Sequence, residues 1–571
     1  MFEQVFRLSR LGNGVARSLR AAVKGAQGPA KVAITVVAVT LSSWSAAPMA
    51  SAARADSRTA KPKPSTTATA RPVQLTVGGV YAGLPIRAGF VGMTNEFWDL
   101  FKAVGQDPTQ PDVPFEQVMR NLAPNGGFSL RIGGDTTDWT WWPVPGMAHP
   151  IWARFTLTPT WMAVAQRLLE DLKAHLIIGI NMEANNPTVA AAEVAAIQSG
   201  IGPTVPTTFE LGNEPELYSK WPFYIEKVGH VVVLGRPKSY SFPQMTSEWD
   251  TLAKALGPVR LAGLGYSSFR ALPHVAQFLH SSPKTSLLTF HTYALTPRNC
   301  QKGGLLQESQ LFDYNSLQRL ANAVEDWTVL GRQNKVAVRV DEINAVTCGG
   351  LAGFSNSLGP ALWALNILPM YAQTGVTGVN FESRPNTAQN LIQPTLTTTG
   401  WQVTVQPEYY GMLAFAQLTP PGSRILSVTP MPNGLLAWAV QTPTHAVNIV
   451  VTNISGRSRR VAVQAFGAGA TGPGTAETLS SATGHLTDTS GITLGGQAID
   501  PQTGQLSGTP VTSRVIPRNR IYNITVGPAS ATILTINGPS PATTQPSSTV
   551  PTTAAPTTTA PTGTTPAGAA S

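Results

Sequence analysis

Short apolar runs alternate with longer amphipathic segments through the middle of the chain. The runs are seven or eight residues long and rich in Val, Ile, Leu and Phe, as expected of strands buried on both faces. They cover residues 87–93, 127–134, 175–182, 207–213, 259–266, 286–293, 336–342 and 376–383. Segments of helical periodicity lie between most of them, for example at 160–174, 315–327 and 357–374. Eight such alternations predict an α/β protein with a (β/α)8 TIM barrel over residues 87–420.

The pattern changes after residues 407–418, which we expect to form the last barrel helix. Short β-runs separated by Gly, Pro and Asn follow, and they predict an antiparallel β-sandwich over residues 421–538. One more β-run, at 73–79, precedes the barrel. We expect the segment 73–86 to add a strand to the sandwich.

The two ends of the chain differ from this core in composition. Residues 1–55 combine a basic segment that ends at Lys31 with an apolar stretch and small residues suited to cleavage, which indicates an export signal. An uncleaved membrane anchor is the alternative, although the apolar stretch is shorter than the roughly 20 residues that span a bilayer. Residues 56–72 form a polar Pro/Thr linker, and 539–571 form a Pro/Thr/Ser-rich tail too polar to fold. We therefore expect a secreted protein or one associated with the cell wall or membrane through its termini.

The net charge of +10 lies mostly in the export signal, which holds seven bases and one acid. The remaining chain has 33 bases and 29 acids, a surplus too small to indicate a nucleic-acid partner. The only two cysteines are Cys300 and Cys348. In an exported protein such a pair predicts a disulfide, here between the loops after the sixth and seventh barrel strands.

Polar and acidic residues recur where the predicted barrel strands end. Because a TIM barrel builds its active site from the carboxyl ends of its strands, this recurrence indicates a functional site. The residues, in chain order, are Asn95, Glu96, Arg131, Asp135, Asp138, Asn181, Glu183, Asn213, Glu214, His291, Tyr293, Asp341, Glu342 and Glu382.

Two of these carboxylates, Glu214 after the fourth strand and Glu342 after the seventh, fit glycoside hydrolysis. One carboxyl group must protonate the leaving oxygen, while the other attacks or stabilises the anomeric carbon. Glu214 would be kept protonated by burial and by its partner's charge, and Glu342 would stay ionised beside Arg131 and Tyr293. The alternatives are that Glu214 is an exposed turn acid and that Asp341, rather than Glu342, faces the site.

The motifs LRIGGDTTDW (130–139), FELGNEPELY (209–218) and FHTY (290–293) resemble glycoside hydrolase family 79, in clan A, which contains β-glucuronidases and heparanase. The resemblance implies that Glu214 is the acid/base and Glu342 the nucleophile. By the same resemblance, Asn213 contacts the sugar 2-hydroxyl, Tyr293 orients the nucleophile, and Glu96 contacts sugar hydroxyls. The loop 344–350 would present backbone donors to a uronate carboxylate.

The roles of several neighbours stay open. Arg131 is a substrate-binding residue or a structural arginine that holds the nucleophile, and His291 contacts substrate or is a satisfied barrel histidine. Asp135 and Asp138 contact substrate or cap the helix after the second strand. Glu210 is expected to pair with a buried base and Glu216 to face solvent. Three tryptophans after the second strand either stack on sugar rings or anchor their loop: Trp139, Trp141 and Trp142.

The sequence thus predicts an exported retaining β-glycosidase acting on β-glucuronides. The alternatives are a clan A β-glycosidase for a neutral sugar and an inactive, wall-associated carbohydrate-binding protein. The eight histidines show no paired metal-ligand spacing, and two carboxylates with a water complete the reaction, so we expect no metal or organic cofactor. Scarcity of Lys and Arg at the strand ends argues against sulfated chains as substrate.

Overall fold

The computed structural model describes residues 71–80, 83–226, 229–298, 300, 304–432, 434–465 and 471–538. The predicted export signal, residues 56–70 of the linker and the predicted tail lie outside the described residues. Within the described part of the chain, no helix is long and apolar enough to cross a membrane.

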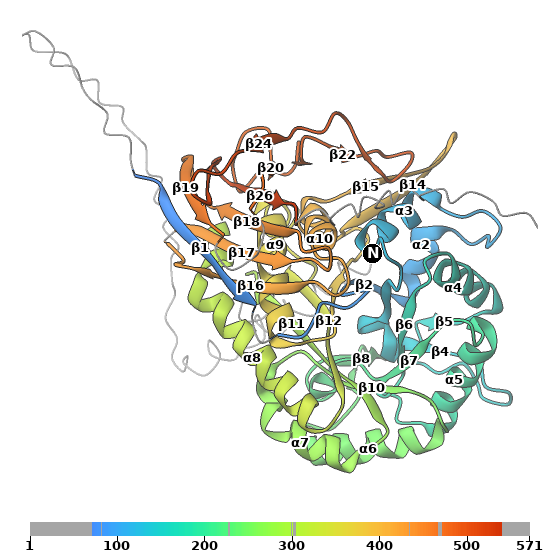
Figure 1. Ribbon diagram of the computed structural model, residues 1–571. Helices are drawn as coiled ribbons and strands as arrows, with labels where there is room; N and C mark the ends of the chain where they lie inside the picture. Colours follow the sequence, from blue (N-terminus) through green and yellow to red (C-terminus); the bar gives the residue numbers. More distant parts are fainter. Residues whose placement is uncertain are drawn as a thin grey trace, which may run out of the picture. The chain divides into compact units, whose positions relative to one another are not determined.

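Eight parallel strands close into a barrel, which confirms the predicted (β/α)8 fold (Figure 1). Each strand pairs in parallel with the next in chain order, and the last pairs with the first through Val379 and Val91. The strands are β2 (Val91–Glu96), β3 (Ser129–Gly133), β6 (His175–Ile180), β7 (Thr207–Leu211), β10 (Leu261–Tyr266), β11 (Thr285–Leu295), β12 (Ala337–Val346) and β13 (Val379–Glu382).

Helices follow the barrel strands, and several of these helices begin at a residue that caps the N-terminus. Asp112, Thr158, Asn186 and Asp313 each accept a backbone N–H of the first turn, which satisfies donors that a helix leaves unpaired. The α-helices are α2 (Leu100–Val104), α3 (Val113–Leu122), α4 (Pro159–Asp171), α5 (Pro187–Ile201), α6 (Phe242–Ala255), α7 (Leu272–Ser281), α8 (Tyr314–Gln333), α9 (Leu358–Thr374) and α10 (Pro407–Leu418). Short 3-10 helices are η1 (Phe97–Asp99), η2 (Gly134–Trp139), η3 (Pro215–Leu217), η4 (Phe269–Ala271) and η5 (Glu308–Phe312).

A separate β-sheet follows the barrel, and β1 (Val73–Val80), from before the barrel, belongs to it. β1 pairs antiparallel with β16 and parallel with β19, so the sheet is mixed rather than purely antiparallel. The other strands are β16 (Arg424–Thr429), β17 (Leu435–Gln441), β18 (Val447–Asn453), β19 (Arg459–Gln464), β20 (Gly474–Ser480), β21 (Thr493–Leu494), β24 (Ser513–Val515), β25 (Ile521–Val526) and β26 (Ser530–Ile536).

The sheet buries both of its faces, and β17 shows how. Alternate residues of this strand point to opposite sides. Leu436 and Trp438 join the core cluster that contains α9 and α10, whereas Ala437 and Ala439 join a second cluster inside the sheet domain. This explains why β17 is apolar at nearly every position and why α9, packed between the barrel and this face, is buried almost all round.

Several short two-strand sheets interrupt the repeat and were not predicted. Three of them follow barrel strands, so they lie at the carboxyl end of the barrel, where long loops carry function. These are β4 (Thr140–Trp141) with β5 (Phe155–Thr156), β8 (Pro222–Ile225) with β9 (Val232–Leu234), and β14 (Ile392–Thr397) with β15 (Gly400–Val405). A fourth pair, β22 (Ala498–Ile499) with β23 (Leu506–Ser507), belongs to the C-terminal region.

Candidate active site

The side chain of Arg131, from β3, lies at the centre of the polar cluster and is fully buried. Its Nε atom is 2.6 Å from Glu210 Oε2 and 3.1 Å from Asp341 Oδ2. Its Nη1 donates to Glu342 Oε2 at 2.9 Å, and its Nη2 donates to Asn213 Oδ1 at 2.9 Å. A buried guanidinium is stable only when acceptors surround it, and here strands β7 and β12 supply them. The sequence left Arg131 as a substrate-binding residue or a structural arginine that holds the nucleophile, and its burial and its contact with Glu342 agree with the second role.

The chain makes room for this guanidinium with a glycine. A Cβ atom at Gly133, two residues further along β3, would lie 3.1 Å from Arg131 Cζ. A side chain there would press on the group that holds Glu342 in place. The Arg-x-Gly spacing of the LRIGG motif therefore has a packing reason.

Glu214 follows β7 in a left-handed backbone conformation, with φ of 49° and ψ of 53°. This region is rare for residues other than glycine, and such residues cluster at functional sites. Its N–H donates to the Gly265 carbonyl at 2.9 Å, and its Oε1 lies 2.9 Å from Nδ1 of His291. Burial and the charges of Glu342 and Asp135 raise the pKa of Glu214, although the contact with His291 opposes this. The net shift of the pKa of Glu214 is upward, which favours its protonated form.

The pKa of Glu342, on β12, is shifted in the opposite direction. It accepts a hydrogen bond from the Tyr293 hydroxyl at 2.6 Å and one from Arg131 at 2.9 Å. Burial alone would raise the pKa of Glu342, but the charges of His291 and Arg131 and the Tyr293 bond lower it. An oxygen of Glu342, an oxygen of Glu214 and a ring nitrogen of His291 all lie within 4.8 Å of one another.

His291 lies between the two glutamates and its side chain is fully buried. Its Nδ1 atom is 2.9 Å from Glu214 and 3.7 Å from Glu342. Burial lowers the pKa of His291, but Glu342 and the hydrogen bond with Glu214 outweigh it and raise the pKa to about 10. The sequence left His291 as a substrate contact or a satisfied barrel histidine, and its burial between two carboxyl groups agrees with the second role.

Asp341 and Glu210 form a deeper layer beneath Glu342. Burial raises the pKa of Glu210, but Arg131 and a hydrogen bond with Asp341 lower it to about 2. Burial and the Glu210 charge raise the pKa of Asp341 far above its usual range. A protonated Asp341 can donate to Glu210, which itself pairs with the buried base Arg131 as predicted. Of the two neighbours in sequence, Glu342 is the one that retains exposure, 8% against 0% for Asp341.

Asp138 fastens the ends of β6 and β7 together. Its carboxylate accepts the backbone N–H groups of Met182, Glu183 and Asn213 and the Tyr218 hydroxyl, at 2.8–3.1 Å. The alternative that Asp138 caps a helix is therefore wrong. Asp138 accepts the backbone N–H of Asn213, and Arg131 donates to the side-chain Oδ1 of the same residue. Both the backbone and the side chain of Asn213 are therefore held in place.

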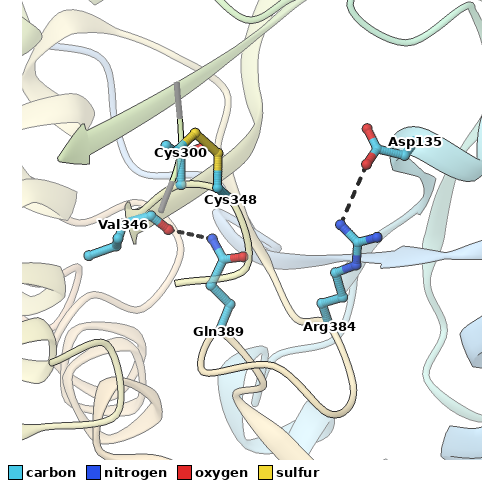
Figure 2. Close-up of a disulfide and its surroundings, with 7 residues drawn as sticks. Asp135, Cys300, Val346, Cys348, Arg384 and Gln389 are labelled. Carbon is cyan, nitrogen blue, oxygen red and sulfur yellow. Dashed lines mark hydrogen bonds and ion pairs between the residues drawn. A yellow bond between two sulfur atoms is a disulfide. The ribbon is translucent and has the colours of Figure 1, made fainter. Parts of the chain in front are cut away.

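A second acidic group lies around Arg384, just after β13. Arg384 Nη1 is 3.5 Å from Asp135 and 4.0 Å from Glu96, and its side chain is 29% exposed (Figure 2). Glu96 accepts the N–H groups of Asp135 and Thr136 and the Thr136 hydroxyl, and burial raises its pKa to about 7 against the effect of Arg384. A Cβ atom at Gly134, where φ is 71°, would meet the Glu96 carboxylate at 2.7 Å.

The loops after β11 and β12 are joined by a disulfide between Cys300 and Cys348, as predicted. Figure 2 shows this disulfide beside Gln389, whose side-chain amide donates to the Val346 carbonyl. The Gly349 carbonyl also accepts the N–H of Ala388. The segment after Glu342 is therefore tied to the segments that follow β11 and β13.

The tryptophans after β3 have different environments. The guanidinium of Arg154 lies 3.7 Å above the Trp139 ring, and Trp98 lies 6.0 Å from that ring. Trp141 is buried against His149, which agrees with an anchoring role.

Two further features of this region were not foreseen. Trp142 lines an apolar pocket between α4 and α5. Glu216, expected to face solvent, accepts the N–H and hydroxyl of Ser267, both at 2.8 Å.

The donor atoms of Glu214, His291 and Glu342 are close enough together to hold a metal ion. The charge around them is better suited to proton chemistry, however. A divalent cation on Glu342 would lie beside the Arg131 guanidinium, whose nitrogen is already 2.9 Å from that carboxylate.

No protein-family model and no curated protein matches the sequence. Among solved structures, the chain is similar to a 4-O-α-L-rhamnosyl-β-D-glucuronidase from Fusarium oxysporum 12S, with 15% identity and a TM-score of 0.63. It is also similar to a GH51 arabinofuranosidase from Xanthomonas axonopodis pv. citri, with 15% identity and a TM-score of 0.56. A family 44 xyloglucanase from Paenibacillus polymyxa follows, with 10% identity and a TM-score of 0.52.

These alignments cover 81%, 81% and 82% of this chain, respectively, and 100% of each of the other chains. At such low identity they show the fold, which this chain shares with glycoside hydrolases of several families. Membership of family 79 stays a prediction.

Asp138→Asn is expected to lower the free energy of unfolding by about 1–3 kcal/mol, because an amide nitrogen would face N–H groups that need an acceptor. Chemical denaturation measures this change. Asp171→Asn is the matched control, since Asp171 makes an exposed ion pair with Arg167 and should change stability by less than about 1 kcal/mol. Equal stability losses in the two variants would contradict the fastening role of Asp138.

Proposed function

We propose that this protein is an exported retaining β-glycosidase that hydrolyses β-glucuronides. The observation that carries the proposal is the pairing of Glu214 and Glu342. Glu214 follows β7 and Glu342 lies within β12. One oxygen of each approaches within 4.8 Å of the other, and their pKa values are displaced in opposite directions. A proton donor beside an ionised carboxylate is the arrangement that glycosidic bond cleavage requires.

The separation of the two carboxyl groups supports retention of configuration. Retaining enzymes hold them about 5–5.5 Å apart, whereas inverting enzymes leave about 6.5–9.5 Å for a water molecule. In the first step the Glu342 oxygen attacks the anomeric carbon while Glu214 gives its proton to the departing oxygen. In the second step Glu214 takes a proton from water, which attacks the anomeric carbon and releases Glu342.

Neighbouring residues support each step. Tyr293 and Arg131 donate to Glu342 and keep it ionised and oriented. Asn213, with its Oδ1 engaged by Arg131, has its amide donor left for a sugar hydroxyl, in agreement with the contact implied by the family resemblance. Each of these groups is held before substrate binds, so the transition state needs little reorganisation.

A negatively charged sugar needs a cation or backbone donors beside the barrel end. Arg384 is partly exposed and stays charged, since Glu96 and Asp135 raise its pKa despite burial. We propose that Arg384, together with the loop 344–350 held by the disulfide, receives the uronate carboxylate. Export through residues 1–55 belongs to the same proposal and agrees with the disulfide.

Glu342→Gln is expected to lower kcat on a chromogenic β-glucuronide by about 10³-fold or more, because the amide cannot form the glycosyl-enzyme. Wild type and variant are assayed in parallel on the matching β-glucoside. Hydrolysis of the glucoside alone would keep the mechanism and reject the glucuronide. Absence of hydrolysis of either would favour a larger substrate or the binding protein.

The pH dependence of kcat/KM is expected to be bell-shaped. Activity should rise with pH as Glu342 ionises, at a pH below the usual range because its pKa is lowered. It should fall as Glu214 loses its proton, at a pH above the usual range because its pKa is raised. A substrate with an activated leaving group, which departs without a proton, allows the Glu214→Gln variant to be assayed. In this variant kcat/KM should no longer show the part of the alkaline fall that the ionisation of Glu214 causes. An unchanged alkaline fall in that variant would remove Glu214 as the acid.

Arg384→Gln is expected to raise KM for the glucuronide by about tenfold or more, the scale of one charge-assisted hydrogen bond. KM for a neutral β-glycoside should change much less. Arg298→Gln is the matched control, because Arg298 is an exposed arginine on the neighbouring loop after β11. If Arg298→Gln, and not Arg384→Gln, selectively raises KM for the glucuronide, the uronate carboxylate lies toward the loop after β11 and the role of Arg384 is refuted.

A further inference from the structure

The Tyr293 hydroxyl touches two carboxyl groups at once. It lies 2.6 Å from Glu342 Oε1 and 2.6 Å from Glu382 Oε2. The three residues come from the adjacent strands β11, β12 and β13. A tyrosine hydroxyl has one hydrogen, so it can donate to only one of the two. At 2.6 Å the other contact would bring two lone pairs together unless a second proton lies between the oxygens.

The surroundings decide which carboxyl group carries that proton. Glu342 is paired with Arg131 at 2.9 Å and lies 3.7 Å from His291, so its charge is compensated. Among the described residues, no Lys, Arg or His nitrogen lies within 4.0 Å of Glu382. Glu382 is buried and faces Tyr293 from β11 and Glu342 from β12.

The remaining charged groups around Glu382 do not reverse this difference. The carboxyl of Glu96, from β2, disfavours a charge on Glu382. Among the described residues, Arg384, two positions further along the chain, is the cation whose charge lowers the pKa of Glu382. Burial and the negative charge of Glu342 therefore oppose ionisation, and only a more distant guanidinium and the Tyr293 contact favour it.

We propose that Glu382 is held as a neutral carboxylic acid that donates to Tyr293 Oη and thereby directs the single hydrogen of Tyr293 to Glu342. Glu382 is a positioning residue, since it acts on the nucleophile through Tyr293. The effect of Glu382 on catalysis rests on the glycosidase activity proposed above, whereas the protonation of Glu382 does not. The pKa of Glu382, raised to about 8 chiefly by burial and then by Glu342, agrees with the geometry.

Loss of this proton would change the nucleophile. An ionised Glu382 would compete with Glu342 for the hydrogen of Tyr293, and Glu342 would lose a donor on one of its oxygens. A second negative charge would also lie one hydroxyl away from Glu342, in surroundings where charge is poorly screened. The alkaline fall in activity should therefore contain the ionisation of Glu382 as well as that of Glu214.

The proton is tested by infrared difference spectroscopy on purified full-length protein. Between about pH 6 and about pH 10, wild type should lose a carboxylic-acid C=O band, with a midpoint near 8, that Glu382→Gln does not show. Other buried acids cancel in this double difference. Glu325→Gln is the matched control, because Glu325 is exposed on α8 and its removal should leave the acid bands of wild type unchanged.

Tyr293→Phe provides the test that does not depend on folding of the Glu382 variant. Without the hydroxyl, the Glu382 O–H loses its acceptor, so the acid band should shift in frequency. Absence of a band assigned to Glu382 at about pH 6, or a band that is identical in Tyr293→Phe, would overturn the proposal.

Kinetics test the coupling to Glu342. The amide of Glu382→Gln can still donate to Tyr293 but cannot ionise, so its alkaline fall should lose the component contributed by Glu382. Glu382→Met has no donor and should have kcat/KM about tenfold below Glu382→Gln, the scale of one lost hydrogen bond. An alkaline fall identical in wild type and Glu382→Gln would overturn the coupling. Failure of every glycoside assay would refute the glycosidase and leave the infrared result standing.

Discussion

The buried guanidinium of Arg131 is the constraint on which the rest of the site depends. Removing one positive charge from water costs several kcal/mol unless acceptors surround it. Arg131 meets that cost with Glu210, Glu342 and Asn213, which come from the fourth and seventh barrel strands. The same contacts therefore stabilise the barrel interior and fix the residues proposed for catalysis. Loss of the arginine would leave buried carboxylates without a partner.

The carboxyl groups around Arg131 have pKa values shifted in two opposite directions. Four carboxyl groups lie within 4.0 Å of Arg131 or His291, and a fifth, Glu382, is joined to Glu342 through Tyr293. Two of the five, Glu210 and Glu342, have lowered pKa values. The other three have raised pKa values and are Glu214, Asp341 and Glu382.

An interior in which a net charge would be costly thus holds acids whose pKa values are shifted in both directions. These opposite shifts suit neighbouring glutamates to different roles. The charges of His291 and Arg131 lower the pKa of Glu342, whereas burial raises that of Glu214, which makes no contact with Arg131. The difference arises from position in the site, since the two residue types are the same.

The sequence predicted the barrel because parallel strands are buried on both faces and appear as uninterrupted apolar runs. It also predicted that Arg131 and Tyr293 would lie beside Glu342, and their contacts of 2.9 Å and 2.6 Å agree. The carboxyl ends of barrel strands meet in space, so residues at strand ends can be grouped before any coordinates exist.

The protonation states and the fastening residues could not be predicted in the same way. Asp138 binds N–H groups 44 and 75 residues away in sequence, and no local sequence pattern predicts such partners. The position of His291, buried between two glutamates, depends on the stagger of β11 against β12, where the register shifts between Phe290 and His291. The strand pairs after β3, β7 and β13 carry weak periodicity because they are short and only partly buried.

The backbone at Glu214 shows what such fastening accomplishes. A non-glycine residue in the left-handed region costs about 1–3 kcal/mol, so the chain adopts it only where surrounding bonds over-determine the turn. Asp138 holds the N–H of Asn213, and the Gly265 carbonyl holds the N–H of Glu214.

Gly212, with φ of 77°, admits the Tyr218 hydroxyl at a place where a Cβ atom would lie only 2.4 Å from it. Bonds on both sides of Glu214 therefore keep its carboxyl beside His291 and within 4.8 Å of Glu342. A relaxed, extended turn would carry the same side chain in another direction, and the proton donor would lose its place beside the nucleophile.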